Sequence, residues 1–194
     1  TINMFWKHKK APQGTVGDYR QSLVRALVNN MLSARFGELS QKASAPFVYA
    51  DAGYGGFLGR STDAFTAAAM PKENQIEATV EMLLTELKRA DQHGFVQTEL
   101  DRAKEDMLSS YQKYAKEENK TQSVSFANEY TNHFLEGEVI PGIRQEYRYV
   151  KEFMPQITLE EVNALIAGWI TDENFVFYLT APEKEGYKVP TKDE

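Results

Sequence analysis

The chain has 194 residues, of which 42% are hydrophobic and 26% are charged, an ordinary globular composition that can form a sizeable core. Its 22 basic and 28 acidic residues give a net charge of −6, which argues against a nucleic-acid partner because phosphate contacts need a basic surface. The absence of cysteine excludes disulfides, thiol catalysis and cysteine-bound metals. No apolar run approaches the roughly 18–20 residues of a membrane span. Because the chain opens on Thr1 and ends in a polar run, we interpret it as a segment of something longer.

The N-terminal part of the chain predicts a strand followed by a long helix. Residues 2–8 are rich in aromatic side chains and lead into the turn-forming sequence KKAPQG. Thr15 is placed to cap the helix, which must end at 44–46 because a residue before proline disfavours the helical conformation. Apolar residues spaced by three and four bury one face of this helix. They are Val16, Tyr19, Leu23, Val24, Leu27, Val28, Met31, Leu32, Phe36 and Leu39.

Between residues 47 and 70 the apolar period changes to two, which indicates strands. In the first strand the alternation assigns Phe47, Tyr49 and Asp51 to one face. A second alternating segment follows the glycine-rich stretch DAGYGGFLGRSTD at 51–63. Two strands joined by glycines predict a β-hairpin, which closes at the next proline.

The second half of the chain predicts five helices and a final strand at 175–181. Two of the helix starts carry capping-box sequences, Thr98 with Asp101 and Thr158 with Glu161. The five helices are expected at 72–93, 98–114, 121–135, 143–154 and 158–169. In the helix at 121–135 four apolar residues lie in register, namely Val124, Ala127, Tyr130 and Phe134.

This order of elements predicts an α+β fold, because no strand–helix–strand alternation persists. We expect a two-layer sandwich in which several helices cover one side of an antiparallel-rich sheet. No internal repeat or low-complexity linker divides the chain. We therefore predict a single domain over residues 1–186, followed by a polar tail or linker at 187–194.

The histidines, the usual acid, base and metal-binding groups, form no complete motif. Among the three, His133 lies one turn before Glu136 in an H-x-x-E pattern. A zinc site of the H-x-x-E-H type needs a second histidine at the next position, which is Gly137 here. One histidine and one carboxylate are too few for a catalytic zinc, so we interpret His133 as a surface or helix-end residue.

The glycine-rich stretch at 51–63 raises the alternative of a phosphate-binding loop. Such a loop runs from a strand directly into a helix, whose N-terminus holds the phosphate. Here the glycines precede a predicted strand, Leu58 takes the position of the third glycine, and no P-loop lysine follows. These departures favour a bulged or strongly twisted hairpin over a nucleotide site.

The sequence also has to be searched for a serine nucleophile and for an aromatic ligand-binding site. No G-x-S-x-G elbow is present, so no serine nucleophile is placed beside a histidine base. Tyrosines recur at 111, 114, 130, 147 and 149, where an aromatic ligand box is the alternative to packing. Several of them fall at core-facing spacing, which favours packing.

The elements together resemble the second, non-catalytic domain of the pitrilysin/insulinase family of zinc metallopeptidases, the clamshell proteases of the inverzincin type. The resemblance rests on the long helix ending in MLSARFGELSQK, the glycine-phenylalanine turn and the strand ending in TAAAMP. It continues in GFVQTELDRAKEDMLSSY, VIPGIRQEYRYVKEFMPQITLEEVNALIAGWIT and NFVFYLTAPEKEG. It covers residues 15–186 and is greatest to the large bacterial members with four such domains in one chain.

The resemblance implies where the chemistry of the parent protein lies. Two such domains make a half, and two halves close around a peptide. Zinc is held in the preceding domain by H-x-x-E-H and a distant glutamate, and this chain contains neither. We therefore expect no catalytic residue, metal ligand or cofactor here, with zinc in the parent's preceding domain.

Related domains carry an arginine and a tyrosine, seven residues apart after the long helix, that contact the substrate. Aligning the E-L of ARFGEL places Ser40 and Phe47 at these positions, so the family's substrate-binding pair is replaced. Arg60, in the hairpin connection, remains the candidate for substrate binding.

We hypothesise that the chain is a structural, chamber-forming domain of a zinc endopeptidase that degrades peptides. Its expected partners are the zinc-bearing domain, the other half of the same polypeptide and a peptide substrate, with no nucleic acid and no membrane segment. The alternative is a domain of a catalytically inactive homologue that acts as a structural or peptide-binding subunit. A periplasmic or secreted location is favoured, and the isolated chain is expected to self-associate through the surface that meets its neighbours.

Overall fold

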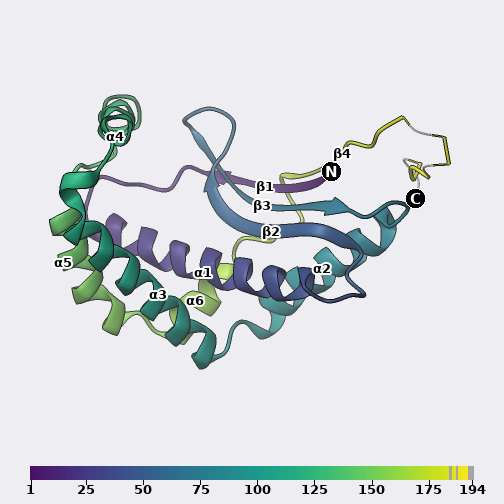
Figure 1. Ribbon diagram of the computed structural model, residues 1–194, viewed down its shortest axis with the longest axis horizontal. Helices are drawn as coiled ribbons and strands as arrows, with labels where there is room; N and C mark the ends of the chain where they lie inside the picture. The colour runs from purple at the N-terminus through teal and green to yellow at the C-terminus, as the bar shows by residue number, and fades with distance from the viewer. Residues whose placement is uncertain (184, 187, 192–194) are drawn as a thin grey trace.

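The computed structural model describes residues 1–183, 185–186 and 188–191 (Figure 1). The order of strand, long helix, hairpin, helices and strand is as predicted, and the predicted α+β class is confirmed. Of the predicted tail at 187–194, residues 187 and 192–194 lie outside the described residues. The elements are β1 (Ile2–Lys9), α1 (Val16–Ser40), β2 (Phe47–Gly56), β3 (Thr62–Pro71), α2 (Ile76–His93), α3 (Gln97–Lys116), α4 (Ser123–Glu136), α5 (Ile143–Phe153), α6 (Leu159–Ile166) and β4 (Phe175–Leu179), with 3₁₀ turns η1 (Glu118–Lys120) and η2 (Met154–Gln156).

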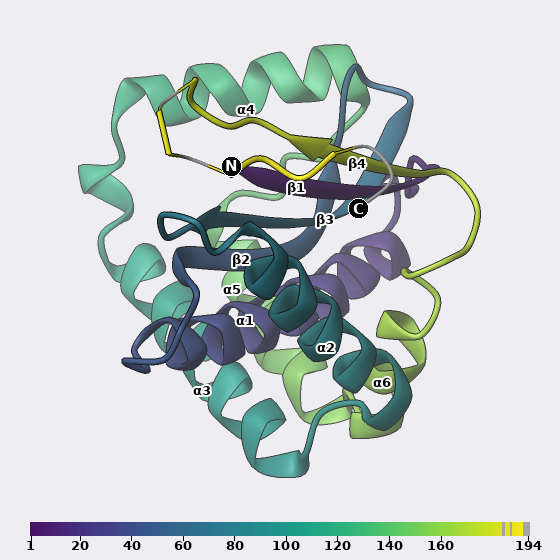
Figure 2. The ribbon, with the colours of Figure 1, turned by 90° about the vertical axis from the view of Figure 1, so that its right-hand side faces the viewer.

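The four strands form one antiparallel sheet in the order β2-β3-β1-β4. Helices α1, α2, α3, α5 and α6 lie together on one side of this sheet, below it in Figure 1 and in Figure 2. Helix α4 stands apart from the other helices in both views. The helix layer therefore covers one face of the sheet, in agreement with the predicted two-layer sandwich.

The core lies between the sheet and α1. The register places Ile2, Met4 and Trp6 of β1 beside Ala69, Ala67 and Phe65 of β3, and all six side chains are buried. Helix α1 buries the stripe that the spacing of three and four predicted. Its buried residues are Leu23, Val24, Leu27, Val28, Met31, Leu32 and Phe36.

Strand β2 departs from the predicted alternation because it contains a β-bulge. Phe47 pairs with Pro71 and Tyr49 with Met70, which leaves Val48 without a partner. The extra residue shifts the phase by one, so Phe47 is buried while Tyr49 is exposed. The assignment of Phe47, Tyr49 and Asp51 to one face was therefore wrong.

The start of α1 is capped as the sequence predicts. The Thr15 side chain accepts a hydrogen bond from the Asp18 N–H (3.1 Å), and the Asp18 carboxylate accepts one from the Thr15 N–H (2.9 Å). The Asp18 pKa lies below its ordinary value because the Thr15 hydroxyl hydrogen-bonds to its carboxylate. Thr158 caps α6 by accepting from the Glu161 N–H (3.2 Å), but the Glu161 carboxylate accepts from Arg20 (2.8 Å), so the predicted capping box is only half formed.

Helix α2 begins at Ile76 rather than at residue 72, and two further predicted helix boundaries were wrong. Helix α3 begins after Val96, whose N–H donates to the Glu99 carboxylate (2.8 Å), so Thr98 lies inside the first turn and is not the cap. Helix α6 ends at Ile166, and Trp169 stacks instead on Tyr54, with ring centroids 4.9 Å apart. At α3 a local hydrogen bond sets where the helix begins, and at α6 a ring contact with a distant residue accompanies its early end. The spacing of apolar residues does not contain either contact.

Helix α4 has the predicted period, but none of its residues is buried. Val124, Tyr130 and Phe134 are exposed, Phe134 by 85%. Its C-terminal end is attached to the loop after β1, where Lys10 forms an ion pair with Glu136 and the Gln13 side chain donates to the Glu136 carbonyl (3.2 Å). The apolar side of helix α4 is therefore exposed to water.

Gly94, which ends α2, supplies a test of this account. Its φ of 67° and ψ of −157° suit glycine alone, and a Cβ there would collide with the side-chain amide of Asn163. We expect Gly94→Ala to lower the free energy of unfolding by about 3 kcal/mol. Gly137→Ala is the control, because its φ is also positive but a Cβ meets nothing within 4 Å, and it should cost about 1 kcal/mol. Urea titrations measure both, and equal losses contradict the proposed clash.

Candidate functional site

The two residues of the H-x-x-E pattern, His133 and Glu136, contact different partners and do not form a common site. His133 Nδ1 lies 2.6 Å from the Glu138 carbonyl, whereas the Glu136 carboxylate pairs with Lys10. His8 Nε2 lies 3.0 Å from the Trp169 carbonyl. Within the part of the chain that the structure describes, no group of three or more histidine, aspartate or glutamate side chains is arranged to hold a metal ion.

The glycine-rich stretch at 51–63 is the connection of a β-hairpin, as predicted. Strand β2 ends at Gly56 and β3 begins at Thr62, so a strand and not a helix follows the glycines. Without a helix N-terminus the stretch lacks the feature that holds phosphate in a nucleotide-binding loop. Gly59 has a positive φ of 78°, which is the conformation that the turn requires.

Gly53 permits a close approach between the hairpin and α1. The Asn29 side chain donates to the Tyr54 carbonyl (2.9 Å) and accepts from the Tyr54 N–H (2.8 Å). A Cβ on Gly53 would lie 3.2 Å from this amide, tighter than most side chains allow. Asn29 therefore takes the place of a neighbouring strand at the outer edge of β2.

The three residues singled out from the sequence do not lie together on one accessible surface. The Ser40 hydroxyl donates to the Phe36 carbonyl (2.7 Å), and Phe47 is fully buried. Arg60 is exposed in the hairpin connection. The Glu136 pKa lies below its ordinary value, chiefly through the hydrogen bond from Lys10 and in smaller part through the charge of Arg60. The charge of Arg60 therefore acts on the C-terminal end of α4.

The tyrosines divide between packing and exposure. Tyr111 is half-buried beside Tyr19, and burial raises the pKa of both hydroxyls. Tyr114 and Tyr130 are exposed, so the five tyrosines do not share one pocket. A cleft of about 240 Å³ beside Tyr19 also contains Glu146, whose pKa is raised by burial and then by the charges of its glutamate neighbours.

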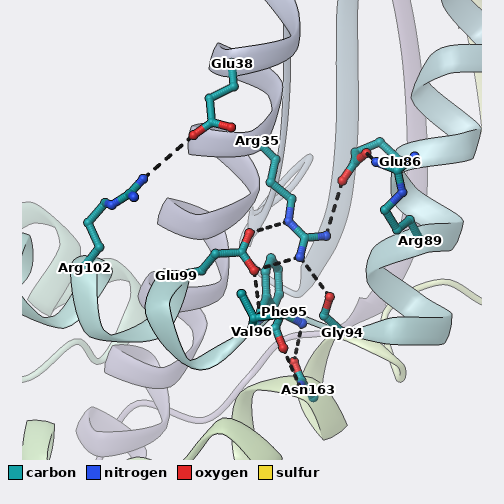
Figure 3. A network of polar contacts seen from close by, with 10 residues as sticks. All are labelled: Arg35, Glu38, Glu86, Arg89, Gly94, Phe95, Val96, Glu99, Arg102 and Asn163. Carbon is teal, nitrogen blue, oxygen red and sulfur yellow. Dashed lines mark hydrogen bonds and ion pairs between the residues drawn. The ribbon is translucent and has the colours of Figure 1, made fainter.

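The densest polar cluster joins four elements around Arg35 of α1 (Figure 3). Its guanidinium donates two hydrogen bonds to Glu99 of α3 (2.6 and 2.9 Å) and one to Glu86 of α2 (3.3 Å). A further bond reaches the Gly94 carbonyl (2.9 Å), and the guanidinium lies 4.6 Å from the ring centre of Phe95. These contacts satisfy Arg35 internally, so we assign the cluster a structural role.

Asn163 extends this cluster to α6. Its side chain accepts from the Phe95 N–H (2.8 Å) and donates to the Phe95 carbonyl (3.3 Å). Glu86 is only 5% exposed and also pairs with Arg89 (2.8 Å). Burial raises the pKa of Glu99, but the hydrogen bonds from Arg35 and Val96 outweigh this and leave the pKa below its ordinary value. No pattern in the sequence marked Arg35 or Glu86, because the contact joins helices far apart in the chain.

The remaining candidate is a surface. The side chains of the sheet that point away from the helix layer include Tyr49, Met70, Val176 and Tyr178, all exposed. We call these four residues the open sheet face. The apolar side of α4 is exposed as well, and its members are Val124, Tyr130, Phe134 and Leu135. An apolar surface of this kind is typical of an interface with another domain or protein.

Comparison with known proteins places this fold. No protein-family model matches the chain. A curated relative, "Zinc protease PQQL-like" of Arabidopsis thaliana, is 26% identical over 149 residues, which cover 77% of this chain and 13% of that protein. The first half of the periplasmic protease PqqL from Escherichia coli superimposes with a TM-score of 0.82 at 13% identity, over 91% of this chain and 38% of the other. The peptidase M16 inactive domain from Pseudomonas fluorescens gives 0.62 at 15% identity, over 91% and 39%.

The chain has the fold of a pitrilysin/insulinase-like (M16) peptidase domain, and the resemblance drawn from the sequence is confirmed. It spans a minor part of each of these proteins. The activity of a whole protease is therefore not assigned to it. None of the helices in the described part of the chain combines the length and the apolar run needed to cross a bilayer.

Replacing Arg35 tests the structural role of the cluster. We expect Arg35→Met to lower the free energy of unfolding by about 3 kcal/mol, because two poorly solvated carboxylates lose their shared partner. The matched control is Arg102→Met, which removes a pair with Glu38 whose side chains are 68% and 71% exposed. It should cost less than about 0.5 kcal/mol. Denaturant unfolding measures the free energy of unfolding of both variants. If Arg35→Met loses no more stability than Arg102→Met, the structural role of the cluster is contradicted.

Proposed function

We propose that this chain is a non-catalytic, chamber-forming domain of a zinc-dependent endopeptidase that degrades peptides. The observation that carries the proposal is the asymmetry of the sheet, which has one face covered by the chain's own helices and the other left open. The open sheet face and the apolar side of α4 would then meet the zinc-bearing domain and the other half of the same polypeptide. The similarity to one half of PqqL supports this arrangement.

The residues of this chain do not fit a resident zinc ion. Its three histidines lie in no H-x-x-E-H motif, and His133 and Glu136 face separate partners. The described residues also lack a cluster of suitable ligands. Zinc is therefore assigned by this proposal to a preceding domain, and the contribution of the present chain is to shape the chamber and exclude solvent from the bound peptide.

The alternative is a domain of a catalytically inactive homologue that acts as a structural or peptide-binding subunit. This alternative is supported by the similarity in fold to the inactive M16 domain from Pseudomonas fluorescens, with a TM-score of 0.62. The two proposals differ in one feature, an intact H-x-x-E-H motif in the preceding domain. For the compartment we propose the periplasm or the exterior, in line with the periplasmic protease among the similar structures.

Metal analysis and a cleavage assay test the non-catalytic role. We expect the purified chain to contain no stoichiometric zinc after dialysis against zinc-containing buffer, because no ligand set is assembled. We also expect no cleavage of a quenched fluorescent peptide library by the chain alone. Stoichiometric zinc, or turnover that survives repurification, would refute the proposal.

The uncovered side of α4 predicts self-association of the isolated chain. Light scattering at rising protein concentration should show oligomers, because water-exposed apolar side chains associate. Phe134→Glu places a charge in this surface and should restore the monomer. Asn132→Glu adds the same charge to an exposed, polar position of the same helix and should leave association unchanged. A wild-type chain that stays strictly monomeric counts against this use of α4.

A further inference from the structure

The two edges of the sheet are treated differently. At the β2 edge the Asn29 side chain forms hydrogen bonds with the N–H and the carbonyl of Tyr54, and the bulge at Val48 interrupts the strand. Such devices are typical of edges that are protected against further pairing. The opposite edge is β4, which pairs with β1 on one side.

The hydrogen-bonding register shows which groups of β4 point outward. Thr1 and Thr180 exchange both backbone hydrogen bonds (2.6 and 2.9 Å), and the Lys7 N–H donates to the Asn174 carbonyl (3.1 Å). In an antiparallel pair this direction alternates, so the residues between these positions alternate as well. The residues whose N–H and carbonyl groups point away from β1 are Phe175, Phe177 and Leu179. No backbone hydrogen bond from another described segment reaches these three residues.

The sequence of β4 lacks the usual protection of an edge. The strand reads FVFYL and contains no proline, glycine or charge. Four of its residues, Phe175 to Tyr178, are each exposed by between 41% and 57% on the two faces of the sheet. Unpaired backbone groups flanked by apolar side chains bind an extended chain, because that chain satisfies the hydrogen bonds and covers the side chains.

Charge decides which extended chain fits. Asp172 and Glu173 precede the strand, Glu183 follows it, and neither Asp172 nor Glu173 takes part in an ion pair formed by the described residues. A second copy paired antiparallel about Phe177 would bring these acidic groups together at both ends, which is unfavourable. A segment with basic residues at its ends is complementary in either direction.

We propose that the free edge of β4 binds an extended segment of another polypeptide as a fifth strand, one with an apolar, β-branched centre and lysine or arginine at both ends. Backbone hydrogen bonds to Phe175, Phe177 and Leu179 supply the binding, and the acidic ends of β4 select the charge. The inference concerns this chain alone and stands whether or not a zinc-bearing domain precedes it.

A labelled peptide, Lys-Lys-Val-Thr-Val-Thr-Val-Lys-Lys, is the probe, and fluorescence anisotropy with the Phe134→Glu chain, which keeps α4 from associating, is the measurement. We expect binding that is weakened about tenfold or more when the five central amides are N-methylated, because the centre of the peptide then has no backbone N–H donors. Replacing the four lysines by glutamates should weaken binding to a similar degree at low salt.

Two variants of Phe177 separate the contribution of the backbone N–H to peptide binding from that of the side chain. Phe177→Pro removes an outward N–H without breaking a bond to β1, and proline is tolerated at such edge positions. Phe177→Ala keeps the N–H and removes the same ring, so Phe177→Pro should bind about tenfold more weakly than Phe177→Ala. Near-ultraviolet circular dichroism checks the fold, and the N-methylated peptide decides the matter if Phe177→Pro does not fold.

Three results would overturn the proposal. The first is no binding of the lysine peptide at millimolar concentration. The second is equal binding of the methylated and unmethylated peptides, or equal binding by the two Phe177 variants when both fold. The third is a dimer of the Phe134→Glu chain in sedimentation that Phe177→Pro dissociates and Phe177→Ala does not, which would make a second copy the occupant of the edge.

Discussion

The hydrogen bonds of Arg35 hold the helix layer together at one point. One guanidinium on α1 reaches Glu99 at the start of α3, Glu86 on α2 and the carbonyl of Gly94 between them. Asn163 then fastens α6 to the same loop through Phe95. Because α1 packs against the sheet through its apolar stripe, the cluster keeps α2, α3 and α6 on the face that α1 covers. The open opposite face, on which the proposed function rests, is a consequence of that arrangement.

The molecule therefore has two parts that differ in how they are stabilised. The layer between α1 and the strands is closely packed, with Phe36, Phe47 and Phe65 fully buried. Helix α4 has an ion pair and a hydrogen bond at its C-terminal end, and its apolar side faces water. Segments with few buried contacts open at low free-energy cost. A partner surface over α4 would supply the contacts that the chain itself does not provide.

Periodicity and turn chemistry predicted most of the elements, because those signals are local. Thr15 caps α1 and Thr158 caps α6, as predicted, although the reciprocal bond of a capping box forms only at α1. The failures have a different cause. The bulge at Val48 and the end of α6 before Trp169 depend on pairing and ring contacts with distant residues, which a local pattern does not contain.

The candidate site was less predictable than the fold. The hairpin at 51–63 was recognised because a predicted strand follows its glycines, but Ser40 and Phe47 turned out to be engaged within the domain. The free edge of β4 had no signature in the sequence, because strand order decides which strand lies at an edge. Likewise the apolar side of α4 had the period of a packed helix, and the structure alone showed that it is uncovered.

Hydrogen exchange of α4 tests the central claim, that the chain's uncovered surface is completed by another domain of the same polypeptide. The amides of Ser123–Glu136 would be followed in the isolated chain and in the full-length polypeptide that carries it, with the buried amides of α1 as an internal reference. The account predicts slow exchange of α4 in the full-length protein and fast exchange in the isolated chain, with α1 slow in both. Equally fast exchange of α4 in the two proteins would contradict it.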